Sequence, residues 1–520
     1  MKSPYNSLFS TQFKSNPYYT VDDYLQDIDK HGLEAVWRAI IDLFNQKDDS
    51  YGILSLDNFG ELYEIGLAHV DKVDKKECGK YYTPNDIADL MAEWLMDLKG
   101  ENVCDVCCGT GNLILSYLDK IGKEKAVELI TSSNLYLYDQ DKLALYICQS
   151  IIGIYYGKEI ASYIRCVCGD FLNESINLPD NCKVISNPPY HKVKEMKEGW
   201  VSSDILSQTH EFYSAIMEKV IKTSESSVII TPYSFIGATK FYPLRKLMSK
   251  HNGFIVSFDN MPVGIFTRKK HGVFNTNVTN SVRAAITVVE NREGIYGFKC
   301  SPLLRFRSKD RVSLLKKEVL ESFVGTQYQV ATPDNTRYGK CFRELETVLE
   351  AWQRQSSQTL SDLVRKEGQY QLCIPNTCRY YTVGANRDLD RSGKIILTFA
   401  DESVYLFVYC LINSSFCYWH WRLYDGGITY PPYLLKELPI FIDQLSTEEL
   451  TQLSKLASEM IKAEEDYLVY KKNAGKLQEN IKFPDKYRKQ INQIFFKALG
   501  LDEEGSILEV IHLNTVMTDL

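Results

Sequence analysis

Hydrophobic positions along the chain follow two spacings, and these divide it into regions. Over residues 1–78, apolar side chains recur three or four positions apart, for example at Leu33, Val36 and Ile40, which predicts helices. Between about residues 101 and 235, short and nearly continuous apolar runs alternate with helical or loop segments. This alternation is typical of a parallel sheet covered by helices, so we expect an α/β fold there.

Five apolar runs are the expected strands of this sheet. They are NVCDVCCG (102–109), NLYLYD (134–139), YIRCVCGD (163–170), CKVISNPPY (182–190) and SVIITPYSF (227–235). Residues 254–290 add one or two closing strands. Ahead of the first strand, Pro84 stands at the start of a helix predicted over 87–98.

The second half of the chain has a different pattern of hydrophobic and polar residues. Residues 296–445 consist of short mixed segments rich in aromatics, which indicates a separate module of helices and strands. From 446 to 520 the helical spacing returns, and LTQLSKLASEMIKAEEDYLVYKK predicts amphipathic helix. We therefore expect four parts: a helical region (1–78), a core (79–295), the mixed module (296–445) and a C-terminal helical region (446–520).

Composition narrows the class of protein. Of 520 residues, 44% are hydrophobic and 24% charged, and no run approaches eighteen apolar residues, so no membrane span is expected. The N-terminus lacks the apolar centre of a signal peptide. We therefore interpret the fourteen cysteines, with Cys166 and Cys168 among those in expected core strands, as reduced and buried in a cytoplasmic protein. Cys104 and Cys107 are spaced like half a zinc site, but no second pair follows, so no metal is expected.

Charge is distributed unevenly. The net charge is −7, yet residues 240–317 contain sixteen Lys and Arg against four acids, a local balance of +12 that leaves −19 for the rest. A concentrated basic stretch on an acidic protein is typical of a surface that binds a polyanion such as DNA. The alternative is an ordinary solvated surface.

The first two expected strands end in groups suited to a nucleotide-like ligand. Asp105 is followed by the turn Gly109-Thr110-Gly111, where glycines let backbone N–H groups approach a ligand closely. Asp139 ends the second strand, where a carboxylate accepts both ribose hydroxyls in dinucleotide-type folds. Each segment by itself also fits an ordinary turn or strand end.

The third and fourth strands end in groups suited to a purine. Asp170 offers an acceptor for an adenine amine and Phe171 a ring for its face. After the fourth strand comes Asn187-Pro-Pro-Tyr190, whose two prolines fix the backbone and remove two N–H donors. The Asn187 side-chain oxygen and the carbonyl of Pro188 would then accept both hydrogens of a planar NH2 group, while Tyr190 supplies a flat surface for a flipped base. The alternative is an ordinary turn.

Together these motifs resemble the amino-methylating DNA methyltransferases. The order of Gly79-Lys-Tyr-Tyr-Thr-Pro84, the glycine turn and the Asn-Pro-Pro-Tyr motif is similar to their gamma class, which includes TaqI-like and Eco57I-like enzymes and type I modification subunits. The resemblance implies a Rossmann-like methyltransferase core at 79–295, a target-recognition domain at 296–445 and S-adenosylmethionine as cofactor. It further implies N6 methylation of an adenine flipped out of duplex DNA.

The resemblance also assigns roles to residues. The implied cofactor contacts are Tyr82, Thr83, Asp105, Gly109, Thr110, Gly111, Asp139, Asp170 and Phe171. The implied residues of the target-base site are Asn187, Pro188, Pro189, Tyr190 and a second aromatic from a later strand, for which Phe266 is the candidate and Phe274 the alternative. Arg268, Lys269 and Lys270 are expected to contact DNA. Val106-Cys107 departs from the usual Pro-Ala of the family, a conservative packing change.

Three other functions are weighed against this one. Asn-Pro-Pro-Tyr also suits methyltransferases of a protein glutamine or of RNA, although those resemble the chain only in its core. The chain could alternatively be a modification subunit that depends on a restriction or specificity partner. A cytosine-C5 enzyme would need a Pro-Cys pair, and no Pro-Cys dipeptide occurs. The function expected first is a cytoplasmic, nucleoid-associated adenine methyltransferase in restriction-modification or epigenetic marking.

Overall fold

The structure is a computed structural model. It describes residues 82–260, 263–266, 282–291, 297–324, 338–378, 380–473, 476–501 and 505–512. The contacts divide the chain into two compact units. Of the described residues, unit 1 contains those up to Lys299 together with Arg305–Val324, and unit 2 contains Cys300–Leu304 and those from residue 338 onward. The expected mixed module and C-terminal helical region therefore fold largely as one unit.

Unit 1 is built on an eight-stranded sheet in the order β3-β2-β1-β4-β5-β7-β6-β8. The first five strands run parallel, as predicted, while β7 is antiparallel to both β5 and β6. The strands are β1 (Asn102–Val106), β2 (Leu135–Asp139), β3 (Arg165–Cys168), β4 (Cys182–Ser186), β5 (Ser226–Pro232), β6 (Asn252–Phe258), β7 (Ala284–Glu290) and β8 (Gly297–Leu304). β8 carries the sheet beyond residue 295, the expected end of the core.

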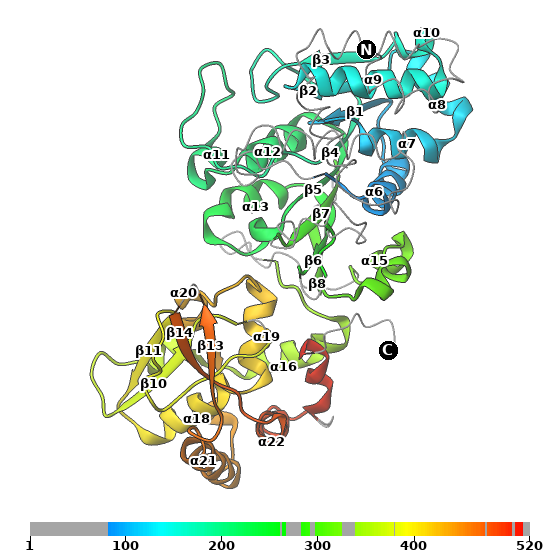
Figure 1. Ribbon diagram of the computed structural model, residues 1–520. Coiled ribbons are helices and arrows are strands. Elements are labelled where there is room, and N and C mark those ends of the chain that lie inside the picture. The colour runs from blue at the N-terminus through cyan, green and yellow to red at the C-terminus, as the bar shows by residue number, and fades with distance from the viewer. Residues whose placement is uncertain are drawn as a thin grey trace, which may run out of the picture. The chain divides into compact units, whose positions relative to one another are not determined.

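Helices cover both faces of this sheet. Figure 1 shows α6 and α7 on one side and α12 and α13 on the other. The helices are α6 (Asn85–Asp97), α7 (Asn112–Ile121), α8 (Lys123–Thr131), α9 (Lys142–Tyr156), α10 (Lys158–Ala161), α11 (Asp204–Thr209), α12 (Phe212–Thr223), α13 (Tyr242–Met248), α14 (Arg311–Leu314) and α15 (Lys317–Ser322). α6 follows Pro84 and confirms the helix predicted there. The α/β fold is confirmed.

The strand order reverses between β1 and β4, because the chain leaves β1 toward β2 and β3 and returns on the other side. In open α/β sheets, ligands bind beyond the carboxyl ends of the strands at such a reversal. The four polar segments found in the sequence all follow the carboxyl ends of β1, β2, β3 and β4. Topology therefore brings them to one edge of the sheet.

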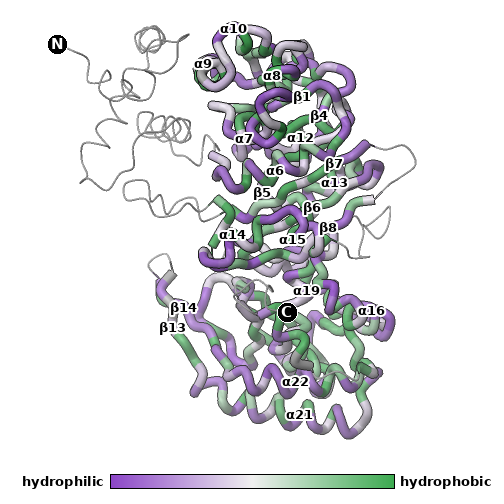
Figure 2. Tube along the Cα trace, turned by 90° about the vertical axis from the view of Figure 1, so that its right-hand side faces the viewer, coloured by the Kyte–Doolittle hydropathy of each residue, from purple (hydrophilic) through white to green (hydrophobic). Residues whose placement is uncertain are grey.

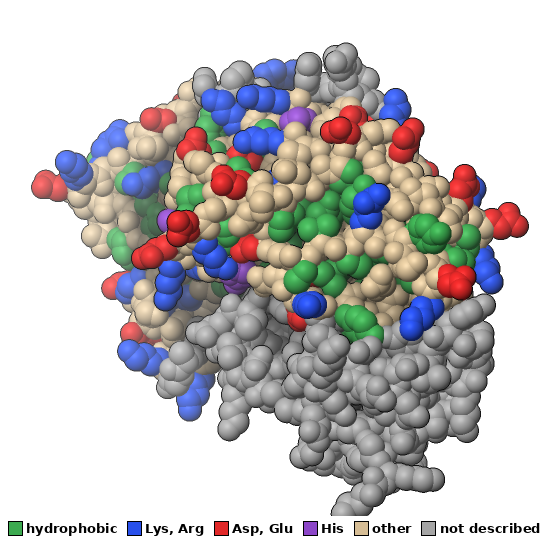
Figure 3. Space-filling model, turned by 90° about the horizontal axis from the view of Figure 1, so that it is seen from above, with side chains coloured by type: hydrophobic (Ala, Val, Ile, Leu, Met, Phe, Trp, Pro, Cys, Tyr) green, Lys and Arg blue, Asp and Glu red, His purple; other side chains and the backbone are tan. Residues whose placement is uncertain are grey.

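β3 lies at the edge of the sheet, which corrects one expectation. Cys166 and Cys168 were expected in the core, but both are exposed because β3 has a neighbour on one side only. Cys104, Cys108 and Cys182 are buried, as predicted. On the face of the molecule seen from above, hydrophobic side chains gather in a patch among interspersed acidic and basic ones (Figure 3).

Unit 2 is a mixed unit with an aromatic core. Its helices are α16 (Glu346–Gln355), α17 (Leu360–Leu363), α18 (Glu402–Ile412), α19 (Ser415–Tyr424), α20 (Pro432–Lys436), α21 (Thr447–Lys462) and α22 (Asp485–Ala498). Its strands pair as β9 (Gln358–Thr359) with β12 (Pro439–Ile440), β10 (Tyr370–Pro375) with β11 (Lys394–Phe399), and β13 (Leu468–Asn473) with β14 (Lys476–Ile481). Large side chains fill the core, including Trp352, Trp419 and Trp421.

The C-terminal region is not all helix, and the prediction of helix through residue 472 was wrong. α21 ends at Lys462, and the following LVYKKN forms β13, which pairs with β14 as a hairpin. The run of Leu, Val and Tyr favours a strand over a helix. In Figure 2 hydrophilic and hydrophobic positions alternate along α21, as expected for a helix buried on one face.

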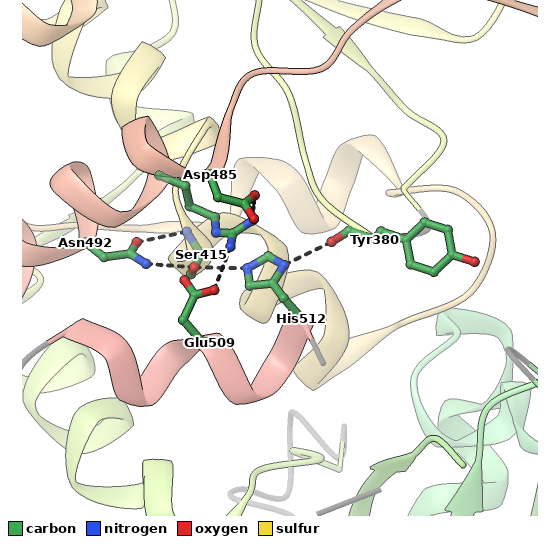
Figure 4. A network of polar contacts seen from close by, with 7 residues as sticks. Tyr380, Ser415, Asp485, Asn492, Glu509 and His512 are labelled. Carbon is green, nitrogen blue, oxygen red and sulfur yellow. Dashed lines mark hydrogen bonds and ion pairs between the residues drawn. The ribbon is translucent and has the colours of Figure 1, made fainter. Parts of the chain in front are cut away.

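A network of polar contacts joins α19, α22 and the last described residues of unit 2 (Figure 4). The Ser415 hydroxyl lies 2.9 Å from Nε2 of His512, and Asn492 donates to the same hydroxyl at 2.8 Å. His512 belongs to the 3-10 turn η8 (Gly505–His512), and Arg488 of α22 pairs with Glu509 of that turn. Ser415 has no exposed surface, so this serine–histidine pair holds helices together and cannot act on a substrate.

Candidate functional site

A cavity with about 910 Å3 of empty space, including its open mouth, lies at the carboxyl ends of the parallel strands. The lining residues are Tyr82, Thr83, Cys107, Cys108, Gly109, Thr110, Asn112, Leu113, Tyr138, Asp139, Gln140, Ala144, Gly169, Asp170, Phe171, Asn187, Pro189 and Phe212. Seven of the nine implied cofactor contacts line it; Asp105 and Gly111 do not.

The glycine turn between β1 and α7 uses its two glycines for different purposes. Gly109 has φ 53° and lines the cavity, so its backbone is open to a ligand. Gly111 has φ 92°, and a Cβ there would lie 2.2 Å from Sγ of Cys148 in α9. Gly111 is therefore required for the close approach of α9, which is a packing role.

Asp139 is fixed by backbone donors on both carboxylate oxygens. Oδ2 accepts from the Gly109 N–H and Oδ1 from the Asp141 N–H, each at 2.8 Å. Asp139 lines the cavity, so its carboxylate lies where the hydroxyls of a ligand can reach it. A carboxylate at this place suits a ribose.

Phe171 and the loop after it are held by Lys219 of α12. The Lys219 ammonium donates to the carbonyls of Phe171, Asn173 and Ile176 at 2.7, 3.0 and 2.6 Å. It also lies 4.7 Å from the centroid of the Phe171 ring. Burial lowers the pKa of Lys219. The loop beside the cavity therefore has its carbonyls gathered around one internal cation.

Asp105 differs from the other acids of the site. Its side chain has no exposed surface, and it is not among the lining residues. Burial raises the pKa of the Asp105 carboxyl well above its usual range, which favours the neutral acid. The Asp105 carboxyl is thus buried and outside the cavity lining, and its expected contact with a cofactor stays a prediction.

Asn187 is oriented by the segment that precedes α6. Its Nδ2 donates to Oγ1 of Thr83 at 2.9 Å, and Nδ2 of Asn112 donates to the Thr83 carbonyl at 2.6 Å. With the amide nitrogen committed to Thr83, the amide oxygen faces the opposite direction as an acceptor. Thr83, expected to contact a cofactor, thus also sets the orientation of the target-base asparagine.

Tyr190 and Phe266 lie together, as the sequence predicted. Their ring centroids are 6.1 Å apart, and Tyr213 lies 6.3 Å from Tyr190 on another side. The Tyr190 hydroxyl donates to Oδ1 of Asn187 at 2.7 Å, a contact that the sequence did not suggest. Pro188 is buried and does not line the cavity, whereas Pro189 does. Phe274 lies outside the described residues.

Nine lining residues were not among the expected site residues, and two of them, Asn112 and Phe212, were missed for different reasons. Asn112 directly follows the glycine turn as the first residue of α7, so its position was a usable signal. Phe212 lies at the start of α12, far along the chain from Phe171, and no local pattern marks it. Burial raises the pKa of the Cys108 thiol, so this lining cysteine is not an activated nucleophile.

The basic stretch is less available for DNA than its charge count suggested. Arg268, Lys269 and Lys270 lie outside the described residues. Several of its other cations are bound internally: Arg283 and Arg305 both pair with buried Asp259, and Arg311 pairs with Asp86. Asp259 is already subtracted in the balance of +12, whereas Asp86 lies outside residues 240–317, so its pairing with Arg311 brings the free positive charge of the stretch below +12.

Asn386 and Arg387 of unit 2 are polar and basic residues of the expected target-recognition module, residues 296–445. Both are engaged by neighbours, since Glu464 accepts from the Asn386 N–H at 2.7 Å and Arg387 lies 3.7 Å from Glu465. Within the described ranges, no group of three or more His, Cys, Asp or Glu could hold a metal. In those ranges, too, every helix is too short or too polar to cross a bilayer.

Parts of the sequence are similar to those of known proteins. Residues 54–227 match the family model described as N-6 DNA Methylase. The type II methyltransferase M.VspI of Vibrio sp. (strain 343) is 25% identical over 269 residues, 48% of this chain and 62% of that protein. The methylase subunit of the type I restriction enzyme MjaIX of Methanocaldococcus jannaschii is 35% identical over 85 residues, 16% of this chain and 14% of that subunit. The chain thus spans less than two thirds of either relative.

Among solved structures, a nuclease-deletion mutant of the type ISP restriction-modification enzyme LlaGI, in complex with a DNA substrate mimic, aligns with 89% of this chain and 65% of its own. The identity is 12% and the TM-score 0.45. The family match at 54–227 includes the glycine turn, Asp139, Asp170 and the Asn-Pro-Pro-Tyr motif. Residues 54–227 of this chain are therefore similar to the N-6 DNA methylase family.

Proposed function

We propose that the chain transfers a methyl group from S-adenosylmethionine to the N6 amine of adenine in duplex DNA. The observation that carries the proposal is the placement of Asn187 at the wall of a cavity that also contains Asp139, Asp170 and Phe171. One wall suits a nucleoside, and the other offers an oriented acceptor for an amine. The family match supports the same chemistry.

The residues divide the task between holding and activating. The bound cofactor would supply a methyl group on a positively charged sulfur. Asp139 would hold its ribose, while Asp170 and Phe171 would hold its purine. Asn187 would accept a hydrogen bond from the target amine, which keeps the nitrogen lone pair directed at the methyl carbon. Tyr190 and Phe266 would stack on the flipped base.

A direct experiment tests the substrate and the acceptor atom together. The purified chain is incubated with duplex DNA and labelled S-adenosylmethionine, and the DNA is then digested to nucleosides for mass analysis. We expect N6-methyladenine. Finding only N4-methylcytosine would overturn the assigned acceptor, and label on RNA or on a protein glutamine in place of DNA would overturn the substrate.

A second candidate is a modification subunit whose specificity comes from another polypeptide. The 35% identity to a type I methylase subunit favours it. Residues 338–512 of unit 2, which we propose as the chain's own recognition domain, argue for the first candidate because they provide a second folded body. Methylation by the chain alone, at a defined sequence, distinguishes the two. Activity only after addition of a specificity subunit would favour the second.

A further inference from the structure

The segment that follows the target-base motif also reaches the cofactor side of the cavity. The segment 191–201 begins beside α12, where the Phe212 N–H donates to the His191 carbonyl at 3.1 Å. It ends beside the loop after β3, where the Val201 N–H donates to the Leu172 carbonyl and the Glu174 N–H to the Gly199 carbonyl, each at 2.9 Å. It therefore spans from the target-base motif to the purine side.

Asp170 receives two donors from this segment on the same oxygen. Nε1 of Trp200 donates to Oδ2 at 3.0 Å, and Nζ of Lys197 lies 3.3 Å from it. The Lys197 ammonium also lies 5.2 Å from the Trp200 ring centroid. Trp200 is 9% exposed and packs edge-on against Phe212, a lining residue, with ring centroids 5.8 Å apart. The indole is thus held in place from behind.

The acceptor positions of Asp170 determine what is left for a ligand. A carboxylate has about four lone-pair positions, two on each oxygen. Trp200 and Lys197 use those of Oδ2, and the Leu172 N–H uses one on Oδ1 at 3.2 Å. A single position on Oδ1 remains. With Oδ2 occupied, Asp170 cannot rotate to present a different oxygen without breaking the indole bond.

We propose that Trp200 is a positioning residue that fixes Asp170 so that its remaining acceptor selects a purine bearing an amine at C6. The inference rests on the proposed function, because it takes the cofactor to be an adenosyl compound. A purine with an oxo group at C6 would present a second acceptor to Asp170 and be rejected. Selectivity at this atom would then depend on a residue ten positions beyond Tyr190.

The test measures binding and needs no turnover. Affinities of the full chain for S-adenosyl-L-homocysteine and S-inosyl-L-homocysteine are measured by calorimetry. Trp200→Phe removes the N–H donor and retains the ring against Phe212. We expect the adenosyl compound to bind roughly five- to tenfold more weakly, the usual effect of removing one hydrogen bond, with little change for the inosyl compound. The ratio of the two affinities should therefore fall.

Trp94→Phe is the matched control, because Nε1 of Trp94 also donates to a carboxylate, Oε1 of Glu321 at 2.8 Å, within unit 1 and away from the cavity lining. It should leave the ratio unchanged. Lys197→Met removes the second donor from a side chain that is 66% exposed, so it should fold normally and lower the ratio less. An unchanged ratio in Trp200→Phe, or in Lys197→Met if the first variant is unfolded, would overturn the inference. Failure of the wild-type chain to bind the adenosyl compound would instead overturn the proposed function.

Discussion

Asp139 and Asn187, on the cofactor half and the target-base half of the cavity, are held in different ways, although Asp170 of the cofactor half is also held by side chains, those of Trp200 and Lys197. On the cofactor half, Asp139 receives backbone N–H groups on both oxygens, and Lys219 gathers three backbone carbonyls beneath Phe171. On the target-base half, Asn187 is held by side chains, by Thr83 on its nitrogen and by Tyr190 on its oxygen.

This difference separates hydrogen bonds that stay in place when a ligand binds from one that must be replaced by the ligand. Backbone donors belong to the sheet and its turns, so they stay in place whether or not a ligand is bound. The Tyr190 hydroxyl can rotate away, and Oδ1 of Asn187 then becomes available to an amine. Substitutions in the first half should therefore change affinity, and substitutions in the second should change the rate.

Asn187→Ala gives the largest expected effect. It removes the acceptor directed at the target amine, so kcat should fall by roughly 10³-fold or more. Cofactor affinity should stay close to that of the wild type, because Asp139, Asp170 and Phe171 are untouched. Single-turnover methylation and calorimetry measure the two quantities. If the variant loses cofactor as severely as Asp139→Ala, the division between the halves is wrong.

Asp139→Ala should weaken cofactor binding by about 1–3 kcal/mol, the usual range for removal of a charged hydrogen-bond partner. It also leaves the N–H groups of Gly109 and Asp141 without their acceptor. Asp139→Asn is the matched variant and should lose less, because one carbonyl oxygen remains. At saturating cofactor, kcat should recover in both. A kcat that stays low at saturation would place Asp139 in the chemical step.

Tyr190→Ala should lose about 1–3 kcal/mol of stacking with the flipped base. Tyr190→Phe keeps the ring and removes the hydroxyl that occupies Oδ1 of Asn187, so its activity should largely remain. Fluorescence of 2-aminopurine at the mapped target position reports the base leaving the duplex. A Phe variant as inactive as the Ala variant would show that the hydroxyl, and not the ring, is essential.

The next prediction concerns the stability of unit 1, in which Lys183 of β4 contacts α6. Nζ donates to the carbonyl of Leu95 in α6 at 3.1 Å, and burial lowers the pKa of Lys183 to about 8 from 10.5. Between those pH values Lys183 binds more protons in the unfolded chain, so its contribution to the free energy of unfolding should rise with pH. This contribution should amount to about 3 kcal/mol at most. In chemical denaturation from pH 7.5 to 10.5, the free energy of unfolding of the wild type should rise by this amount relative to that of Lys183→Met.

Neutralising Arg268, Lys269 and Lys270 together tests a basic stretch that lies outside the described residues. DNA affinity should weaken for all sequences alike, and the log–log salt slope should flatten by about 0.9 for each phosphate that the variant no longer neutralises. Cofactor affinity and the methylated sequence should not change, because phosphate contacts carry no sequence information. An unchanged salt slope would remove this loop from the DNA-binding surface.

The sequence predicted the parts of the site that depend on local chemistry. The strands, the glycine turn, Asp139, Asp170 and Asn187 all follow from apolar runs that end in polar residues. The adjacency of Tyr190 and Phe266 was also predicted. Each of these motifs can be recognised from a few neighbouring residues. A parallel sheet then brings the motifs together, because its strands end at the same edge.

The remaining features depend on distant partners. The exposure of Cys166 follows from the position of β3 at the edge of the sheet. The order of strands in a sheet cannot be predicted from the sequence of a single strand. From the sequence, Arg283 and Arg305 are expected to be surface charges, because their ion pairs with the buried Asp259 are visible only in the structure. The β13–β14 hairpin was missed because YLVYKK continues the helical spacing of α21, although its residues favour a strand.

Lys219 performs a task that many proteins assign to a bound ion. Three carbonyls converge on its ammonium, much as carbonyl oxygens converge on calcium in a ligand-binding loop. Here the cation is covalently attached to α12, so it cannot be diluted, chelated or exchanged. The loop beneath the purine should therefore keep its shape in EDTA and across metal concentrations. The cation that holds the carbonyls of this loop together is therefore part of the chain itself.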